Sequence, residues 1–130
     1  NTFKGTNADV ILHDCIVVNK NADVLADSFF KLRHCRRGFW FNILHNSYIG
    51  CCMALKRSFL TNVLPFPQNI PMHDQWIGLM AEKRHSVAFI KEPLIKYRRH
   101  LENVTKLKPS KFSDIIKFRL NLISALLEQL

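Results

Sequence analysis

Two stretches of this chain are rich in apolar and β-branched residues, and both predict buried strands. Residues 8–19 read ADVILHDCIVVN, and residues 47–55 read SYIGCCMAL with small residues at the centre. Apolar runs of this length are typical of a strand, or a strand pair, that is covered on both faces. The segment 19–23 (NKNAD) supplies turn residues, and two shorter strands are predicted at 86–90 and 93–97.

Helical spacing of apolar residues appears in two further segments. Residues 74–84 and 111–130 place apolar side chains every three or four positions, which predicts amphipathic helices. In the second segment these positions are Phe112, Ile116, Leu120, Ile123, Leu127 and Leu130. Shorter helices are predicted at 39–45 and 56–63, whereas residues 28–37 show no clear period and are predicted to be loop. Strands that interleave with helices in this way indicate an α/β layered fold.

Length and composition allow one modest core. The chain has 130 residues, of which 48% are hydrophobic, and 19 Lys plus Arg against 10 Asp plus Glu give a formal charge of +9. This charge favours an anionic partner such as a nucleotide diphosphate, a nucleic acid or an acidic membrane surface, and it does not choose among them. The basic cluster of Arg33, Arg36 and Arg37 is interpreted as a solvated loop.

The cysteines and the apolar runs indicate in which cellular compartment the protein is located. Cys15, Cys35, Cys51 and Cys52 lack the paired C-x-x-C spacing of a structural zinc site, so we expect four reduced thiols. The sequence shows no charged-then-apolar leader pattern, and none of its apolar runs reaches the roughly 18 residues that a membrane span needs. These features predict a cytoplasmic protein.

A carboxylate lies between a histidine and a tryptophan at the start of the helix predicted from residue 74. His73, Asp74 and Trp76 belong to the sequence PMHDQW. Asp74 fits an N-cap, whose carboxylate accepts hydrogen bonds from the first amides of a helix. It also fits a general base that takes a proton from a sugar hydroxyl, because an aromatic ring nearby can pack on the flat face of a sugar.

A second candidate cluster follows the last predicted strand. Arg98, Arg99 and His100 offer two guanidinium groups and an imidazole, a set suited to a metal-bound diphosphate. The alternative interpretation is a solvated basic edge. Gly50, inside the earlier apolar run, allows another backbone or a ligand to approach closely.

A set of motifs occurs along the chain in a fixed order: ADV at 8–10 with Asp14 and Cys15, NSYIGCCMA at 46–54, LPFP at 64–67, MHDQW at 72–76, EPLI at 92–95 and YRRH at 97–100, followed by Asn103 and Val104. Their joint order and spacing resemble the C-terminal half of a family 2 glycosyltransferase of GT-A fold, over roughly residues 8–105. Within that family the chain is most similar to bacterial rhamnosyltransferase-like enzymes of cell-surface polysaccharide synthesis.

The resemblance assigns roles to the candidate residues. It implies that Asp74 is the general base of an inverting transfer from a nucleotide-sugar donor to a glycan acceptor. It implies that His100 helps to bind a divalent metal, Mn²⁺ or Mg²⁺, on the diphosphate. The residues that it places in substrate binding are His73, Trp76, Gly50, Cys51, Cys52, Arg98 and Arg99.

The chain departs from the pattern of the family in one respect. The nucleotide-binding half and its Asp-x-Asp motif would precede Asn1, so residues 1–108 are expected to form the acceptor-side half of a GT-A (Rossmann-like) domain, and residues 109–130 a C-terminal amphipathic helix. We expect this chain to be inactive alone, and the metal to bind only in the full-length enzyme. An uncovered strand edge and the apolar face of the helix predict self-association, and contact with the inner face of a membrane is a further alternative.

Two other functions stay open on the sequence alone. A basic nucleic-acid-binding module is supported by the charge and by Phe39 and Trp40 near arginines, but the chain has no recognisable nucleic-acid-binding motif. A protein-interaction domain could dock through the C-terminal helix. The nucleic-acid interpretation gives the pair Asp74 and Trp76 no role, so the sequence favours the transferase.

Overall fold

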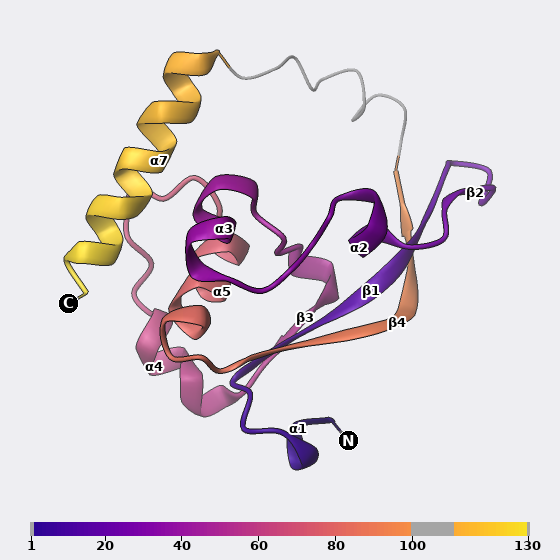
Figure 1. Cartoon of the computed structure of the whole chain (residues 1–130), viewed down its shortest axis with the longest axis horizontal. Helices are drawn as coiled ribbons and strands as arrows, with labels where there is room; N and C mark the ends of the chain where they lie inside the picture. The colour runs from indigo at the N-terminus through magenta and orange to yellow at the C-terminus, as the bar shows by residue number, and fades with distance from the viewer. Residues whose placement is uncertain (1, 100–110, 130) are drawn as a thin grey trace.

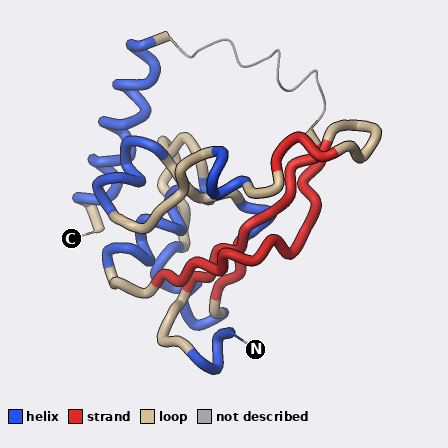
Figure 2. Tube along the Cα trace, turned by 45° about the vertical axis from the view of Figure 1, so that its right-hand side comes forward, coloured by secondary structure: helices blue, strands red, loops and turns tan. Residues whose placement is uncertain are grey.

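The computed structural model describes residues 2–99 and 111–129. These residues form a mixed α/β fold with a four-stranded mixed sheet (Figure 1). Most of the helices gather on one side of the strands, as Figure 2 shows. His100 and the predicted loop that follows it lie outside the described residues.

Strand β1 (Val10–Val18) is the centre of the sheet. Its first residues pair antiparallel with β3 (Met53–Leu55), and its last residues pair antiparallel with β2 (Val24–Ala26). Along its other edge it pairs in parallel with β4 (Val87–Arg98). Most of β1 is buried, so its apolar sequence correctly predicted a strand covered on both faces.

The turn between β1 and β2 follows from its asparagine. Asn19 Oδ1 accepts hydrogen bonds from the backbone N–H groups of Asn21 and Asp23, at 2.8 and 2.9 Å. The side chain of Asn19 thereby replaces backbone partners that the reversing chain would otherwise lack. The turn predicted at 19–23 is confirmed.

β4 corrects the prediction of two separate strands at 86–90 and 93–97. It is a single strand whose register against β1 shifts on either side of Asp14, which pairs with Pro93. Proline has no N–H to donate to a ladder and is tolerated at such irregularities. The break in the sequence pattern at Pro93 is therefore a bulge inside one strand.

Two other local predictions are wrong. Residues 28–37 contain the short helix α2 (Phe29–Leu32), and residues 47–55 form a strand only over β3, because Gly50–Cys52 is the 3₁₀ turn η1. The N-cap of α2 is Ser28, and the carboxylate of Asp14 accepts the N–H of Phe30 at 2.9 Å. This helix thus depends on a residue 16 positions earlier, which no local period reveals.

The remaining helices lie close to their predicted places. They are α3 (Phe39–His45), η2 (Arg57–Phe59) with α4 (Leu60–Val63), α5 (His73–Lys83) and α7 (Phe112–Leu127). A four-residue helix, α1 (Thr2–Gly5), was not predicted. The largest fully buried side chains are Trp76, Phe59, Leu12, Leu79 and Leu122, so the core lies between β1, η2, α5 and α7.

α7 confirms the predicted amphipathic helix. It buries Leu122, Ala125 and Leu126 against the core, whereas Phe112 and Leu120 of the predicted stripe are 78% and 61% exposed. In the part of the chain that the structure describes, no helix combines the length and apolar character needed to cross a membrane.

Candidate functional site

Asp74 is the second residue of α5 and is half-buried. The N-cap of this helix is Met72, which makes no side-chain capping bond, so the interpretation of Asp74 as an N-cap is wrong. Its Oδ1 accepts the backbone N–H of Gln75 at 2.7 Å, and its Oδ2 accepts the backbone N–H of Gly50 at 3.2 Å. The carboxylate therefore ties the start of α5 to η1.

This geometry leaves Asp74 able to accept a further hydrogen bond. An ionised carboxylate offers about four lone-pair positions, and the two N–H donors occupy two of them. The first turn of a helix also favours negative charge, because its free amides point toward it. Asp74 is thus a positioned, partly exposed acceptor that a substrate hydroxyl could reach.

The loop 46–52 presents the partner of Asp74. Asn46 has a positive φ of 44°, and its Oδ1 accepts the N–H of Tyr48 at 3.0 Å. Gly50 is exposed, and a Cβ built on it would meet the Cβ of Asp74 at 3.8 Å, an ordinary contact. Its N–H, rather than its missing side chain, is what joins the loop to α5.

A buried amide network that sequence reasoning missed supports this loop. The Asn42 Nδ2 group donates to the carbonyls of Arg36 and Gly38, both at 2.9 Å, and Asn42 Oδ1 accepts the N–H of Ser47 at 2.8 Å. Gln75 Nε2 donates to the Asn42 carbonyl at 2.8 Å. The one sequence signal was an amide inside the aromatic segment 39–45.

A second buried polar pair, Tyr48 and Glu82, joins the loop 46–52 to α5. The Tyr48 hydroxyl donates to Glu82 Oε1 at 2.9 Å, and the Gly38 N–H donates to the same oxygen at 2.8 Å. Burial, together with the negative charge of Glu82, raises the pKa of Tyr48 well above its ordinary value. Both side chains therefore hold α3, α5 and the loop 46–52 together.

Trp76 and Cys52 do not lie where a substrate could touch them, which corrects both expectations. Both are 0% exposed, and the indole N–H of Trp76 donates to the Val63 carbonyl at 3.1 Å. Burial also raises the pKa of the Cys52 thiol far above its usual range. Helical spacing from Asp74 points Trp76 into the core, so its ring cannot form a platform for a sugar.

Other expected substrate-binding residues remain accessible. Gly50, Cys51 and His73 are exposed, and the His73 ring packs edge-on against Phe66 with ring centroids 4.6 Å apart. All four cysteines are free thiols. His73, Gly50 and Cys51 are therefore the candidates that the structure leaves available around Asp74.

Arg98 and Arg99, the basic residues after the last predicted strand, make no described contact with the residues around Asp74. Arg98 is exposed and Arg99 is half-buried at the end of β4, where the Arg99 N–H donates to the Val18 carbonyl at 2.8 Å. Within residues 2–99 and 111–129, no group of three or more His, Cys, Asp or Glu side chains could hold a metal ion. His100, the ligand that the resemblance implies for Mn²⁺ or Mg²⁺, lies outside the described residues, so the metal stays a prediction for the full-length enzyme.

A cavity of about 560 Å³ opens between α2, the segment after it and β4. Its basic lining residues are Lys31, Arg36, Arg37 and Lys91, with Phe30 and Phe89 as apolar walls. Two of the three arginines interpreted as a solvated loop therefore line a concave surface.

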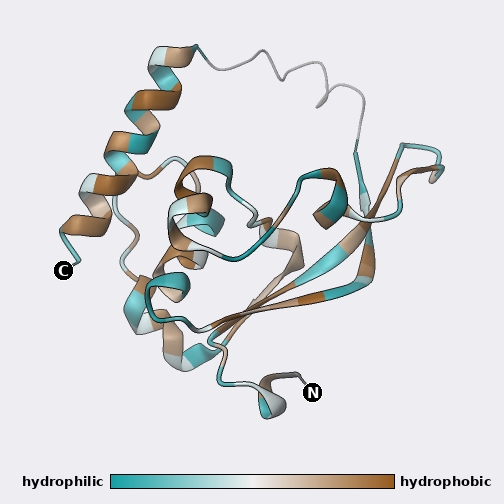
Figure 3. Cartoon of the chain, viewed as in Figure 1, coloured by the Kyte–Doolittle hydropathy of each residue, from teal (hydrophilic) through white to brown (hydrophobic). Residues whose placement is uncertain are grey.

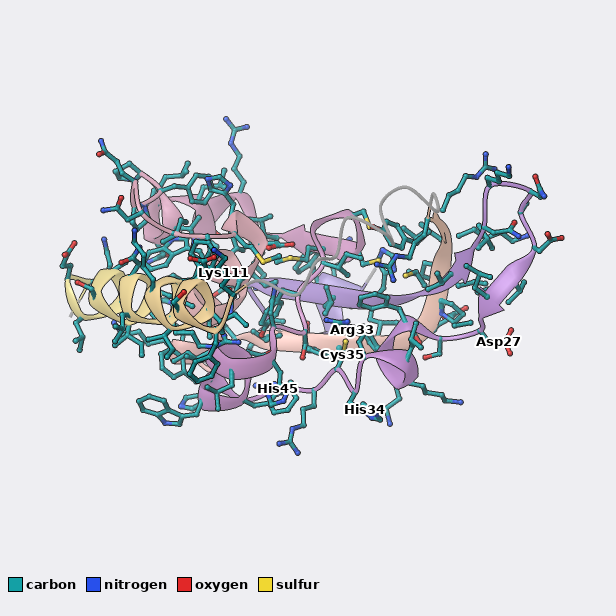
Figure 4. The ribbon with its side chains drawn as sticks, turned by 90° about the horizontal axis from the view of Figure 1, so that it is seen from above. Asp27, Arg33, His34, Cys35, His45 and Lys111 are labelled. Carbon is teal, nitrogen blue, oxygen red and sulfur yellow. The ribbon has the colours of Figure 1, made fainter. Side chains whose placement is uncertain are left out.

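Figure 4 shows Cys35 over the sheet and His34 pointing away from it. Burial raises the pKa of the Cys35 thiol to about 11.

Comparison of the chain with protein-family models, with curated proteins and with solved structures gives no match. The functional argument therefore rests on the residues and geometry described above.

Proposed function

We propose that this chain carries the acceptor-side half of an inverting glycosyltransferase of GT-A fold, with Asp74 as the general base. The observation that most supports the proposal is the hydrogen bond between Asp74 Oδ2 and the Gly50 N–H. The two motifs that the sequence resemblance places beside the acceptor are 24 residues apart, and this bond joins them. The mixed α/β fold is compatible with such a half-domain.

The proposed chemistry is a single displacement. An acceptor hydroxyl donates its hydrogen bond to a free lone pair of Asp74, and its oxygen attacks the anomeric carbon of the donor sugar from the side opposite the leaving group. The new carbon–oxygen bond forms as the bond to the nucleoside diphosphate breaks, and the proton passes to Asp74. The donor is a nucleotide-sugar, rhamnose-like by resemblance, and the acceptor is a glycan of a surface polysaccharide.

The chain's own residues position that step. The N–H groups of Gly50 and Gln75 fix the carboxylate, and the Asn42 network fixes both segments that carry them. His73 and Cys51 line the exposed side of the same helix start and loop. No step is assigned to a metal. A nucleotide-sugar donor and free thiols fit a cytoplasmic location for the reaction.

A donor-cleavage assay tests the proposal without knowledge of the acceptor. The polypeptide that includes the coding sequence upstream of Asn1 should release nucleoside diphosphate from at least one member of a panel of nucleotide-sugars. The 130-residue chain alone should release none, because the proposal places only the acceptor-side half of the site in it and not the residues that bind the nucleotide. Steady release by the 130-residue chain, or none by the extended polypeptide in the presence of Mn²⁺ and mixed glycan acceptors, would contradict it.

A further inference from the structure

α7 carries two apolar faces, and only one of them is packed. Leu122, Ala125 and Leu126 are buried in the core. A second row, here called the outer stripe, follows the helix at steps of three or four residues, and Figure 3 shows apolar residues along its length. The outer stripe consists of Phe112, Ile116, Leu120, Ile123 and Leu127. Four of these five side chains are exposed, so the stripe is a continuous apolar surface.

The outer stripe continues onto the body of the protein. An almost wholly apolar groove of about 380 Å³ lies between α7 and α3, and Ile123 and Leu127 are among its walls together with Phe39 and Trp40. Trp40 is 74% exposed, although it packs edge-on against Phe39 with ring centroids 5.3 Å apart. An exposed indole next to an aliphatic row is the arrangement that favours the boundary between lipid and water.

The charges around this surface have a consistent placement. Lys83 and Glu82 line the groove, and Lys111 lies at the start of α7. Glu82 is buried, and its Oε1 accepts hydrogen bonds from the Tyr48 hydroxyl and the Gly38 N–H, so Lys83 is the more exposed of the two charges. On a helix that turns 100° per residue, Lys117 lies about 60° from Leu120, whereas the acidic Asp114 lies about 160° from Ile116. Lys83 and Lys117 therefore border the outer stripe and the groove, and the one acid of the first turn of α7 is on the far side of the helix.

We propose that the outer stripe and Trp40 dock on an anionic lipid bilayer, with α7 lying in the plane of the interface. At 16 residues, α7 suits a helix that rests on the surface, where apolar burial and attraction to acidic headgroups act together. A second copy of the chain, the occupant that the sequence led us to expect, fits less well, because two molecules each of formal charge +9 repel one another. This inference does not depend on the proposed transferase activity.

Nucleic acid fits the same surface less well. Stacking of a base on Trp40 would need cations nearby to hold the phosphates. The guanidinium of Arg119 is engaged by the carbonyls of Ile43 and Leu44, and that of Arg36 lies over the Phe41 ring at 4.0 Å. The exposed aliphatic side chains of the outer stripe would have no role in such a complex.

Vesicle binding tests the inference with the 130-residue chain. Vesicles of phosphatidylcholine and phosphatidylglycerol in equal parts should sediment the protein and shift Trp40 emission to the blue, while phosphatidylcholine alone should do neither. The chain has two tryptophans and Trp76 is already buried, so Trp40→Phe should abolish the shift. Added salt should weaken binding.

A matched pair of charge substitutions separates the outer stripe from general electrostatics. Leu120→Glu combined with Ile116→Glu should weaken vesicle partitioning roughly tenfold or more, because two apolar side chains no longer enter the lipid. Asn121→Glu, which adds a charge on another face of α7, should change it far less. Circular dichroism checks that both variants remain folded.

Four results would overturn the inference. They are no sedimentation with the anionic vesicles, equal loss of binding in the Asn121→Glu control, a blue shift that grows with protein concentration in the absence of lipid, and a Trp40 response to a mixed-sequence oligonucleotide in place of vesicles. The third result would assign the surface to a second copy of the chain, and the fourth to nucleic acid.

Discussion

The ring of Tyr48 lies so close to Gly78 that a Cβ at position 78 would overlap its ring carbons. Gly78 is in the middle of α5, where glycine normally weakens a helix by about 1 kcal/mol relative to alanine. The ring is held in place, because its hydroxyl donates to the buried Glu82. The glycine thus allows the loop 46–52 to pack directly on the backbone of α5, next to the turn that carries Asp74.

Gly78→Ala should therefore destabilise the protein even though alanine is the better helix former. We expect a loss of about 1–3 kcal/mol in the free energy of unfolding, typical of an overpacked core. Gly5→Ala is the matched control, since nothing lies within 4 Å of a Cβ at that position. Urea unfolding followed by circular dichroism measures both, and equal stability of the two variants would show that the Tyr48 ring can move aside.

Asn42→Leu should destabilise the protein by about 1–3 kcal/mol, because it leaves the buried Ser47 N–H without its acceptor and removes one of the two donors to each of the Arg36 and Gly38 carbonyls. Asn69→Leu, at an exposed loop position, should stay within about 0.5 kcal/mol of the original chain. Chemical unfolding of both variants gives the comparison. A loss below about 1 kcal/mol for Asn42→Leu would mean that water or a shifted backbone replaces the network.

The four thiols should differ in reactivity. At about pH 8 iodoacetamide should label exposed Cys51 first, while buried Cys15 and Cys52 are protected. Cys35, with a pKa of about 11, should be roughly one-thousandth thiolate at that pH and react slowly, with a rate that rises as pH approaches 11. Peptide mass spectrometry measures the order, and urea should make all four reactive. Fast labelling of Cys35 at about pH 8 in the folded chain would contradict the assignment.

The same shift has a consequence for stability. The unfolded Cys35 thiol ionises near its ordinary pKa of 9.0, and the folded one near 11. Above about pH 9 the unfolded chain therefore binds fewer protons than the folded chain, so this group's contribution to stability falls as pH rises.

Trp76→Phe tests the correction made for that residue. Loss of the hydrogen bond to Val63 and of part of a fully buried ring should lower the free energy of unfolding by about 1–3 kcal/mol. In the proposed transferase, the acceptor KM should not change. An acceptor KM that rises severalfold while stability is unaffected would return Trp76 to the substrate site.

The sequence predicted those parts of the fold that depend on local pattern. The central strand, α3, α5, α7 and the turn at 19–23 follow from apolar runs, helical spacing and turn residues. It failed where a residue distant in sequence contributes: Asp14 binds both the N-cap Ser28 and the Phe30 N–H of α2, and β4 accommodates Pro93 in a bulge. The apolar spacing of α7 identified a real stripe, but periodicity does not reveal which of two apolar faces meets the core.

The candidate site shows the same division. That Asp74 lies at the start of a helix was predictable, and its partner Gly50 was expected in the same site only through the family resemblance. The Asn42 and Gln75 amides were missed, because a buried hydrogen-bonded amide and a solvated one read alike in a sequence. Trp76 was wrongly assigned to substrate binding. An aromatic residue next to a carboxylate more often packs in the core than against a sugar, and Trp76 is fully buried.

The most direct test of the central claim is the rate of sugar transfer by Asp74→Asn in the polypeptide extended upstream of Asn1. Asparagine keeps the shape and accepts a hydrogen bond but cannot take a proton. We predict a fall of about a hundredfold to ten-thousandfold in kcat with donor affinity unchanged, while the control Asp114→Asn, at an exposed position of α7, keeps full activity. Turnover by Asp74→Asn close to that of the unaltered enzyme would contradict the assignment of Asp74 as the base.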